Sequence, residues 1–195
     1  MRKLFIFLAL GAMQFASYAQ TNWTVDFVHS SIKFTVTHLV ISEVEGVFKT
    51  YSGTIISNNP DFTDASIDFT VDVKSINTDN EMRDKHLKSA DFFDAEKYPQ
   101  ITFKSSSFIK LSGNNYELSG DLTMHGISKP VKFAVTYGGT VGDGYGHTKA
   151  GFKATTTINR FDYDLKWNAI TEAGSAVVSK EVTINIKLEL LELKK

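Results

Sequence analysis

The residues of this sequence best suited to chemistry are five histidines: His29, His38, His86, His125 and His147. Imidazole binds metals and transfers protons near neutral pH. No two of these histidines are four residues apart, as on a zinc-protease helix, and none forms a His-x-His pair on a strand. A site assembled from distant strands stays compatible with the sequence. One hypothesis is therefore a metal-assisted or acid–base enzyme that uses His38, His86 and His125, and the alternative is that each imidazole caps a strand or bonds the backbone.

Other catalytic signatures have little support in the sequence. There is no Gly-x-Ser-x-Gly elbow, and the chain contains no cysteine to act as nucleophile or thiolate ligand. Asp91 and Asp94 are close in sequence, but they are more simply explained as caps of helical turns. The glycine-rich run 138–146 matches neither a phosphate loop nor a dinucleotide fingerprint and is typical of a hairpin turn. We therefore favour a protein that is not an enzyme and needs no cofactor and no metal.

The elements that must position these side chains are mainly β-strands. Apolar and polar residues alternate with a period of two, which is typical of a strand with one buried and one solvated face. The alternation is strict in four segments and weaker in four others. The strict ones are 31–38, 66–73, 131–137 and 182–188, and the weaker ones are 44–56, 101–110, 115–124 and 149–159.

Short turn signals separate these eight segments, for example Asn58-Asn59-Pro60-Asp61 and Gly142-Asp143-Gly144. Short connections favour antiparallel neighbours, and eight such strands with one apolar face each form a closed barrel or a sandwich. The fold class predicted is all-β, with an eight-stranded antiparallel barrel as the leading architecture. A barrel of this size is either filled by side chains or holds one small ligand.

Residues 78–98 interrupt the β pattern with a charged, helical excursion. Thr78 and Glu81 fit a capping box, so we expect a helix to begin at Thr78. A second helical turn from Asp91 must end near Tyr98, because the proline that follows disfavours a helical residue before it. An excursion of this length between strands is often a lid or a binding loop.

The first nineteen residues predict a secretory signal peptide. A basic start at Arg2 and Lys3 precedes an apolar run that is too short to span a bilayer, and Ala19 offers a cleavage site. We expect a signal peptide at 1–19, one domain at 20–195, and a periplasmic or secreted location. Removing Arg2 and Lys3 takes the formal net charge from −1 to −3, and no basic face indicates a nucleic-acid partner.

Aromatic content is the most informative signal for a ligand. The chain has fifteen phenylalanines, which is high for a β-rich sequence. They either form an ordinary packed core or line an elongated apolar pocket. Six of them fall on the apolar faces of predicted strands: Phe34, Phe48, Phe69, Phe103, Phe133 and Phe152.

Two arginines also have alternative interpretations. Arg83 and Arg160 either pair with a neighbouring carboxylate, Asp84 or Asp162, or bind the polar head group of a ligand at a pocket mouth. The salt-bridge interpretation is favoured, because flanking charges usually serve a solvated surface.

Four segments together resemble one protein family. They read HSSIKFTVTHL (29–39), RDKHLKSADFFDAEKYPQITF (83–103), GDLTMHGISKPV (120–131) and AGFKATTTINRFDYDL (150–165). In order and spacing they look like the YceI-like family of exported lipid- and polyisoprenoid-binding proteins, over about residues 22–190. The resemblance implies a lipocalin-like barrel with an elongated hydrophobic cavity. It also implies a long-chain ligand, such as an isoprenoid, an isoprenoid quinone or a fatty amide, and a homodimer.

The resemblance also suggests which side chains meet the ligand. The aromatic pair of the family matches Phe92 and Phe93. Its recurrent polar positions match His29, Ser30, His38, Arg83, Asp84, His86, His125 and Arg160. Two departures stand out: Asp164 replaces a common glycine, and Tyr51 replaces a common phenylalanine. The leading hypothesis is a carrier that transports, stores or sequesters a lipid outside the cytoplasm, and a binding module for a protein partner is a third hypothesis.

Overall fold

The computed structural model describes residues 20–170 and 177–194, so the predicted signal peptide at 1–19 lies outside the described residues. Within them the chain is almost entirely β-structure, with α1 (Glu81–Lys88) and the 3₁₀ helices η1 (Val73–Ser75) and η2 (Arg160–Tyr163). The strands are β1 (Thr21–Val25), β2 (Ser31–His38), β3 (Ser42–Phe48), β4 (Tyr51–Ser57), β5 (Ser66–Asp72), β6 (Ile76–Asn77), β7 (Gln100–Ser112), β8 (Asn115–Met124), β9 (Ile127–Gly142), β10 (Thr148–Asn159) and β11 (Val178–Leu193).

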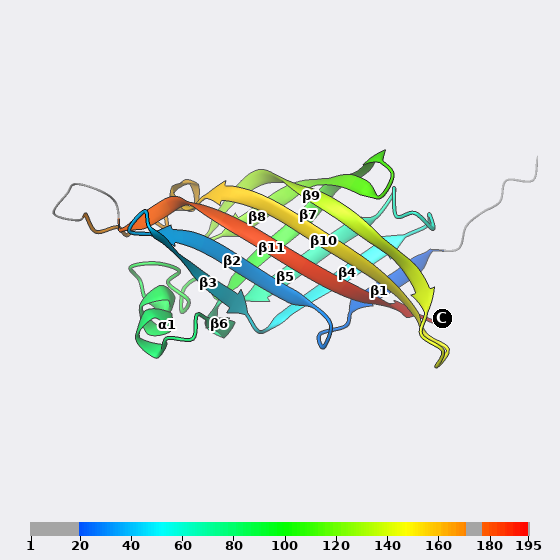
Figure 1. Cartoon of the computed structure of the whole chain (residues 1–195), viewed down its shortest axis with the longest axis horizontal. Coiled ribbons are helices and arrows are strands. Elements are labelled where there is room, and N and C mark those ends of the chain that lie inside the picture. The colour runs from blue at the N-terminus through cyan, green and yellow to red at the C-terminus, as the bar shows by residue number, and fades with distance from the viewer. Residues whose placement is uncertain (1–19, 171–176, 195) are drawn as a thin grey trace, which may run out of the picture.

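The strands close into an antiparallel barrel. Around the ring the order is β1, β4, β5, β7, β8, β9, β10 and β11, and β11 pairs again with β1. Among the described residues this gives eight strand positions, which confirms the predicted eight-stranded antiparallel barrel. Figure 1 shows the strands running obliquely along the long axis, with α1 and β6 at one end and the carboxyl end of the chain at the other.

Three of the eight strand positions are broken by bends. β11 pairs with β2 over Val178–Lys187 and with β1 over Leu190–Leu193, so β1 and β2 follow one another along the same edge of β11. β3 and β4 continue one another in the same way, and η1 separates β5 from β6. The segment predicted as one strand over 44–56 is therefore two strands joined at residues 49–50.

The local alternation predicted most strands but not their full extent. β1 was missed, because only Trp23 and Val25 of this short strand are buried. β9 and β11 each have 16 residues and extend well past the predicted 131–137 and 182–188. The extra residues of β9 are rich in glycine and show no alternation, yet they pair with β10 at Gly139↔Gly151.

A loop closes the end of the barrel opposite α1. Residues 58–65 join β4 to β5 and carry Phe62, whose side chain is 2% exposed. Its ring packs against Trp23, Tyr137 and Phe152 from three different strands, at centroid distances of 5.0–5.6 Å. The Tyr116 hydroxyl donates a hydrogen bond to the Asp61 carbonyl at 3.0 Å and fixes the loop from a fourth strand. We call residues 58–65 the plug loop.

Asp64 organises the plug loop. Its carboxylate accepts hydrogen bonds from the Ser57 hydroxyl at 2.6 Å and from the amides of Asn58 and Asn59 at 2.9 and 3.0 Å. Burial raises the pKa of the Asp64 carboxyl, but the hydrogen bonds from Ser57, Asn58 and Asn59 outweigh burial and hold the pKa at about 2, below the ordinary 3.8.

We expect Asp64→Ala to lower the free energy of unfolding by about 1 kcal/mol, since the bonds are charge-assisted but partly screened by solvent. Because the folded pKa is depressed, this contribution is complete above the ordinary pKa and disappears as the pH falls towards 2. Urea unfolding at pH 7 and pH 2.5 measures both. An equal difference between Asp64→Ala and the native protein at the two pH values would contradict this assignment.

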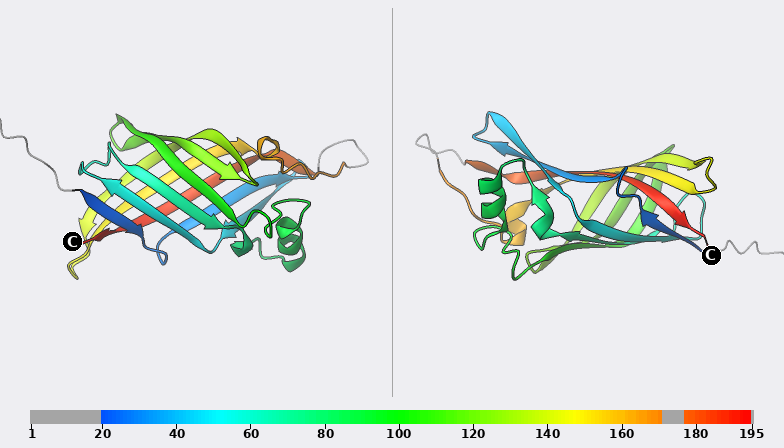
Figure 2. Two further views of the ribbon diagram at one scale, coloured as in Figure 1. Left: turned by 180° about the vertical axis from the view of Figure 1, so that it is seen from behind. Right: turned by 90° about the horizontal axis from the view of Figure 1, so that it is seen from below.

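The excursion between β6 and β7 is only partly helical. α1 covers residues 81–88, and the side chain of Asn80, not Thr78, caps it by accepting from the Arg83 amide at 2.9 Å. The predicted capping box is therefore wrong, because Asn80 stands one residue before the helix. Residues 89–99 form turns rather than a second helix. Both views in Figure 2 place α1 beside the same end of the barrel. No helix in the described part of the chain is long and apolar enough to cross a membrane.

Candidate functional site

The interior of the barrel contains an apolar cavity of about 590 Å³. It is lined along its length by the inward faces of the strands and reaches from Phe62 of the plug loop to Met82 and Arg83 of α1. The six phenylalanines predicted to face the interior all contribute to its wall: Phe34, Phe48, Phe69, Phe103, Phe133 and Phe152. Sequence reasoning left a filled and a ligand-sized interior open, and the structure has the second.

Glycines on neighbouring strands explain why so many rings leave space between them. Phe34 lies opposite Gly46 in the register, and a methyl group on Gly46 would stand only 2.2 Å from the Phe34 ring. Phe69 covers Gly53 in the same way, at 2.4 Å. A ring that lies flat on a neighbouring glycine occupies the barrel wall instead of the lumen.

Arg160 lies buried at the α1 end, where it opens η2. Its guanidinium donates to four backbone carbonyls: Ser179 at 2.9 Å, Trp167 at 2.8 Å, Val178 at 3.3 Å and Leu165. Burial lowers the pKa of this guanidinium. The predicted pairing with Asp162 is wrong, because residues 165–167 and 178–179 surround the side chain with backbone carbonyls.

Arg83 also lacks the predicted ion pair with Asp84. Its Nε and Nη2 atoms donate to the Thr78 hydroxyl and carbonyl, both at 2.7 Å. The buried carboxylate of Asp84 accepts from the Thr78 amide at 2.9 Å and from the Thr78 hydroxyl at 2.6 Å. Thr78 therefore separates the two charges and ties α1 to the end of β6, while Arg83 contributes to the cavity lining.

An aromatic cluster bridges the excursion and the loop after η2. His86, Phe92 and Trp167 lie with ring centroids 5.0–5.1 Å apart, and all three line the cavity. Phe93 lines it as well and packs edge-on against Phe48 at 6.2 Å. Sequence reasoning found Phe92 and Phe93 but missed Trp167. Trp167 lies two residues after the family-like segment 150–165, and this closeness was the signal that could have identified it as a lining residue.

The remaining predicted polar residues are divided between the cavity and the outer surface. His38, at the end of β2, lines the cavity. His125 lies outside the lining, in the turn between β8 and β9, where its ring packs on Tyr98 at a centroid distance of 4.5 Å. His29 also lies outside the lining, in the bend between β1 and β2. Whether any of the predicted residues binds a ligand stays a prediction.

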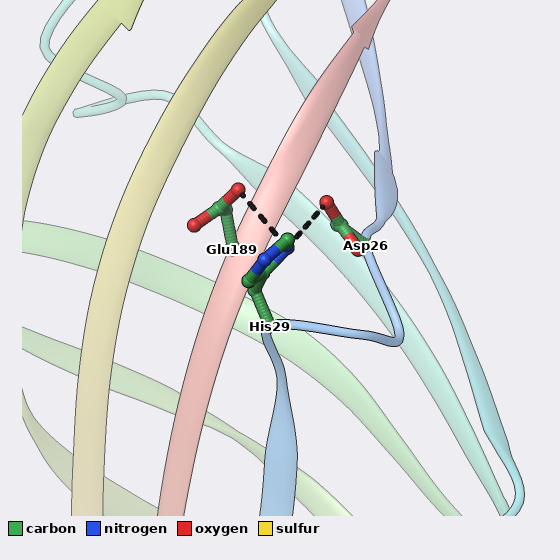
Figure 3. Close-up of side chains that lie close together, drawn as sticks. All are labelled: Asp26, His29 and Glu189. Carbon is green, nitrogen blue, oxygen red and sulfur yellow. Dashed lines mark hydrogen bonds and ion pairs between the residues drawn. The ribbon is translucent and has the colours of Figure 1, made fainter. Parts of the chain in front are cut away.

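His29 belongs to a small charged cluster on the barrel wall. Figure 3 shows its ring beside Asp26 and Glu189, with Nδ1 at 3.0 Å from Asp26 Oδ2 and 3.6 Å from Glu189 Oε1. Lys149 lies between the same carboxylates, 3.0 Å from Asp26 and 2.7 Å from Glu189. Hydrogen bonds from His29 and Lys149 lower the pKa of Asp26 to about 2. The ammonium of Lys149 already occupies the position that a bound cation would take between these carboxylates. The cluster therefore serves to join β10 and β11 to the bend after β1.

The three histidines of the enzyme hypothesis do not come together. Among the described residues, the one group of three metal-ligating side chains within reach of a single ion is Asp26, His29 and Glu189. His38, His86 and His125 come from β2, α1 and the β8–β9 turn, and they form no such group.

Comparison with known proteins matches the whole barrel. The sequence profile of the YceI-like domain matches residues 23–190. The chain belongs to the YceI-like family. It is 33% identical over 198 residues to the protein YceI of Escherichia coli O157:H7, with 100% of both chains covered.

Solved structures show the same YceI-like fold. BcnA of Burkholderia cenocepacia superposes with a TM-score of 0.71 at 27% identity, covering 85% of this chain and 98% of that one. A polyisoprenoid binding domain from Saccharophagus degradans, implicated in plant cell wall breakdown, superposes with a TM-score of 0.61. It is 18% identical and covers 86% of this chain and 97% of that domain, so the likeness extends to the fold alone.

The departures of this YceI-like chain from the family pattern have identifiable positions. Asp164 follows η2 with φ of 60°, in the left-handed region where glycine is the easiest residue to place. Asp tolerates this region better than most residues. Tyr51 begins β4 and stacks on Phe69, a residue of the cavity lining, at a centroid distance of 5.9 Å. Tyr51 itself is buried but is not part of that lining.

Proposed function

We propose that this YceI-like protein is an exported lipid-binding protein that holds one long-chain amphiphile in its cavity. A polyisoprenoid, an isoprenoid quinone or a fatty amide fits the proposal, and the role would be transport, storage or sequestration outside the cytoplasm. The observation that carries the proposal is the apolar cavity of about 590 Å³, a size typical of small-molecule sites. The polyisoprenoid-binding domain that shares this fold supports the same class of ligand.

The cavity wall would supply most of the affinity. Each methylene buried against it contributes roughly 0.8 kcal/mol. The plug loop closes the far end, so the apolar chain would extend towards Phe62 and leave the polar head at the α1 end. Arg83 is the side chain best placed for that head, because Thr78 takes two of its five N–H donors.

Organic extraction followed by mass spectrometry tests the lipid-binding function. Protein purified from the native compartment should release a long-chain molecule in a stoichiometric amount. Stripped protein should take up an added isoprenoid quinone, and the fluorescence of Trp167 in the cavity lining should change on binding. If no such molecule co-purifies and none binds on addition, the proposal fails.

Export is proposed from residues 1–19 alone. The intact mass of protein recovered from the periplasm or the medium should correspond to a chain that begins at Gln20. Recovery of the full-length chain from the cytoplasmic fraction would contradict this part of the proposal.

The enzyme hypothesis gains no support from the structure. His38, His86 and His125 lie on β2, α1 and the β8–β9 turn, and among the described residues they form no shared metal-ligating group. The family and its solved members are consistent with a binding protein rather than a catalyst.

Phe93→Ala is expected to weaken the binding of a long-chain probe by about tenfold, because it removes one ring from the cavity wall. Asp94→Ala is the matched control, one residue further along. Asp94 has φ of 45°, so alanine there should reduce local stability but leave binding unchanged. Fluorescence titration and thermal unfolding separate the two effects. If both variants bind like the native protein, the turn after α1 is structural and not a part of the binding site.

A further inference from the structure

The turn between β2 and β3 presents three consecutive apolar residues to solvent. Leu39 is partly exposed, Val40 is 71% exposed and Ile41 is 86% exposed. Leu39 and Val40 also have left-handed backbones, with φ of 52° and 65°. A β-branched residue rarely adopts this conformation, and glycine or asparagine is the ordinary choice in such a turn. The chain thus holds an apolar tip in a strained conformation where a polar turn would be easier to form.

Further exposed apolar residues lie at the same end of the barrel as this tip. The Leu39 amide donates to the Val177 carbonyl at 2.9 Å, and the Val177 amide donates to the Ala169 carbonyl at 2.9 Å. These two bonds hold the turn against the segment that carries Ile170, which is 75% exposed. On α1, Met82 is 84% exposed. We call Leu39, Val40, Ile41, Met82 and Ile170 the mouth rim.

The mouth rim is continuous with the cavity. Met82 is both exposed and part of the lining, so the cavity reaches the surface beside α1. His38 precedes the apolar turn in the sequence, and Val177 is hydrogen-bonded to it through the Leu39 amide. Both residues also line the cavity. The plug loop closes the other end with Phe62. A ligand that enters the lumen therefore passes the mouth rim.

The charges beside the mouth rim are of both signs. Glu43 of β3, Glu81 and Lys85 of α1, and Lys180 near the start of β11 are exposed, so the described residues form no basic patch here that would select an anionic partner. An exposed apolar patch with a polar border is typical of a surface that contacts a membrane or a protein. Continuity with a lipid-sized cavity favours the membrane, because an apolar chain could then pass from bilayer to lumen without crossing water.

We propose that the mouth rim docks on the surface of a lipid bilayer, with Val40 and Ile41 inserted among the acyl chains, and that the ligand is exchanged there. The proposal rests on the lipid-binding function proposed above. It adds the route by which the ligand enters and leaves. Electrostatic attraction has no part in it, so docking should persist on neutral vesicles and at high salt.

The test compares Val40→Asp/Ile41→Asp with the native protein, and Val141→Asp is the control. Val141 is 65% exposed on β9 towards the plug-loop end and does not line the cavity. Flotation with phosphatidylcholine vesicles measures docking. Transfer of a pyrene-labelled fatty acid from these vesicles to the protein measures exchange. We expect the double variant to lose about tenfold or more in both, since two apolar side chains that would insert among the acyl chains become charged.

Delivery of the same probe from a cyclodextrin complex distinguishes this proposal from the proposed function. The double variant should bind the probe from cyclodextrin as well as the native protein does, which shows a folded and competent cavity.

Three results would overturn docking: flotation unchanged by the double substitution, a transfer rate independent of vesicle concentration, or loss in Val141→Asp of the same size. The native protein could instead fail to float with vesicles and form a dimer that the double substitution dissociates. In that case the rim binds a second copy, and the proposal is wrong. A native protein that binds the probe from neither source would refute the lipid-binding function itself.

Discussion

Ala154→Trp is expected to abolish binding of a long-chain ligand and to leave the barrel folded. Ala154 lies on β10 between Val135 and Ile186 in the register, and all three side chains line the cavity. An indole at this position would extend into the middle of the lumen. In a close-packed core such an enlargement costs about 1–3 kcal/mol of stability. Here the cavity of about 590 Å³ can accept the ring, so the substitution should reduce ligand affinity and not stability.

Thr155→Trp is the matched control, because it adds the same side chain one residue along β10 on the solvated face. Titration of both variants with a pyrene-labelled fatty acid should show binding lost in Ala154→Trp, by at least about a hundredfold, and retained in Thr155→Trp. Thermal unfolding should show both variants folded. Native affinity in Ala154→Trp would mean that the ligand does not occupy the cavity.

Arg160→Met should have the largest effect on stability, lowering the free energy of unfolding by about 3–5 kcal/mol. The four carbonyls that accept from Arg160 belong to Leu165 and Trp167, which follow η2, and to Val178 and Ser179, which begin β11. Methionine has a similar length but no donor, so these carbonyls would stay buried without partners. The loop after η2, including Trp167, would then lose its anchor.

Arg160→Lys tests whether the fork geometry matters. An ammonium has three donors on one atom and cannot reach carbonyls on opposite sides, so this variant should regain only part of the lost stability. Arg83→Met is the control for removing a cavity-lining arginine. Its effect should be smaller, because within residues 20–170 and 177–194 the Arg83 guanidinium bonds Thr78 alone. Urea unfolding of the three variants gives the order. A loss below 1 kcal/mol for Arg160→Met, on the scale of an exposed charge, would refute the anchoring role.

The predictions about polar side chains were the least successful. Arg83, Arg160 and the helix cap at Thr78 were all assigned to near neighbours in the sequence, and all three have other partners. Arg160 is the clearest case, because its acceptors at Val178 and Ser179 come from the start of β11. A side chain with several donors bonds whatever the fold brings close, and sequence proximity says little about that.

Alternation of apolar and polar residues predicted most of the strands and the face of each that points inward. Successive side chains of a strand point to opposite faces, so alternation is a local property that any window of six residues displays. The inward positions of Phe34, Phe69 and Phe133 were accessible in this way, and the short turns between strands added the antiparallel barrel. The family was accessible from the four motif segments that resemble it.

Whether the rings fill the barrel or surround a cavity depends on contacts between strands that are distant in the sequence. That outcome depends on which residue faces each ring across the strand register, as Gly46 faces Phe34 and Gly53 faces Phe69. Register is set by bends and turns distributed over the whole chain, so no local pattern contains it. The same holds for the plug loop and the mouth rim. Phe62 and Ile41 are both apolar loop residues, and only their position in the closed barrel makes one a plug and the other part of the mouth.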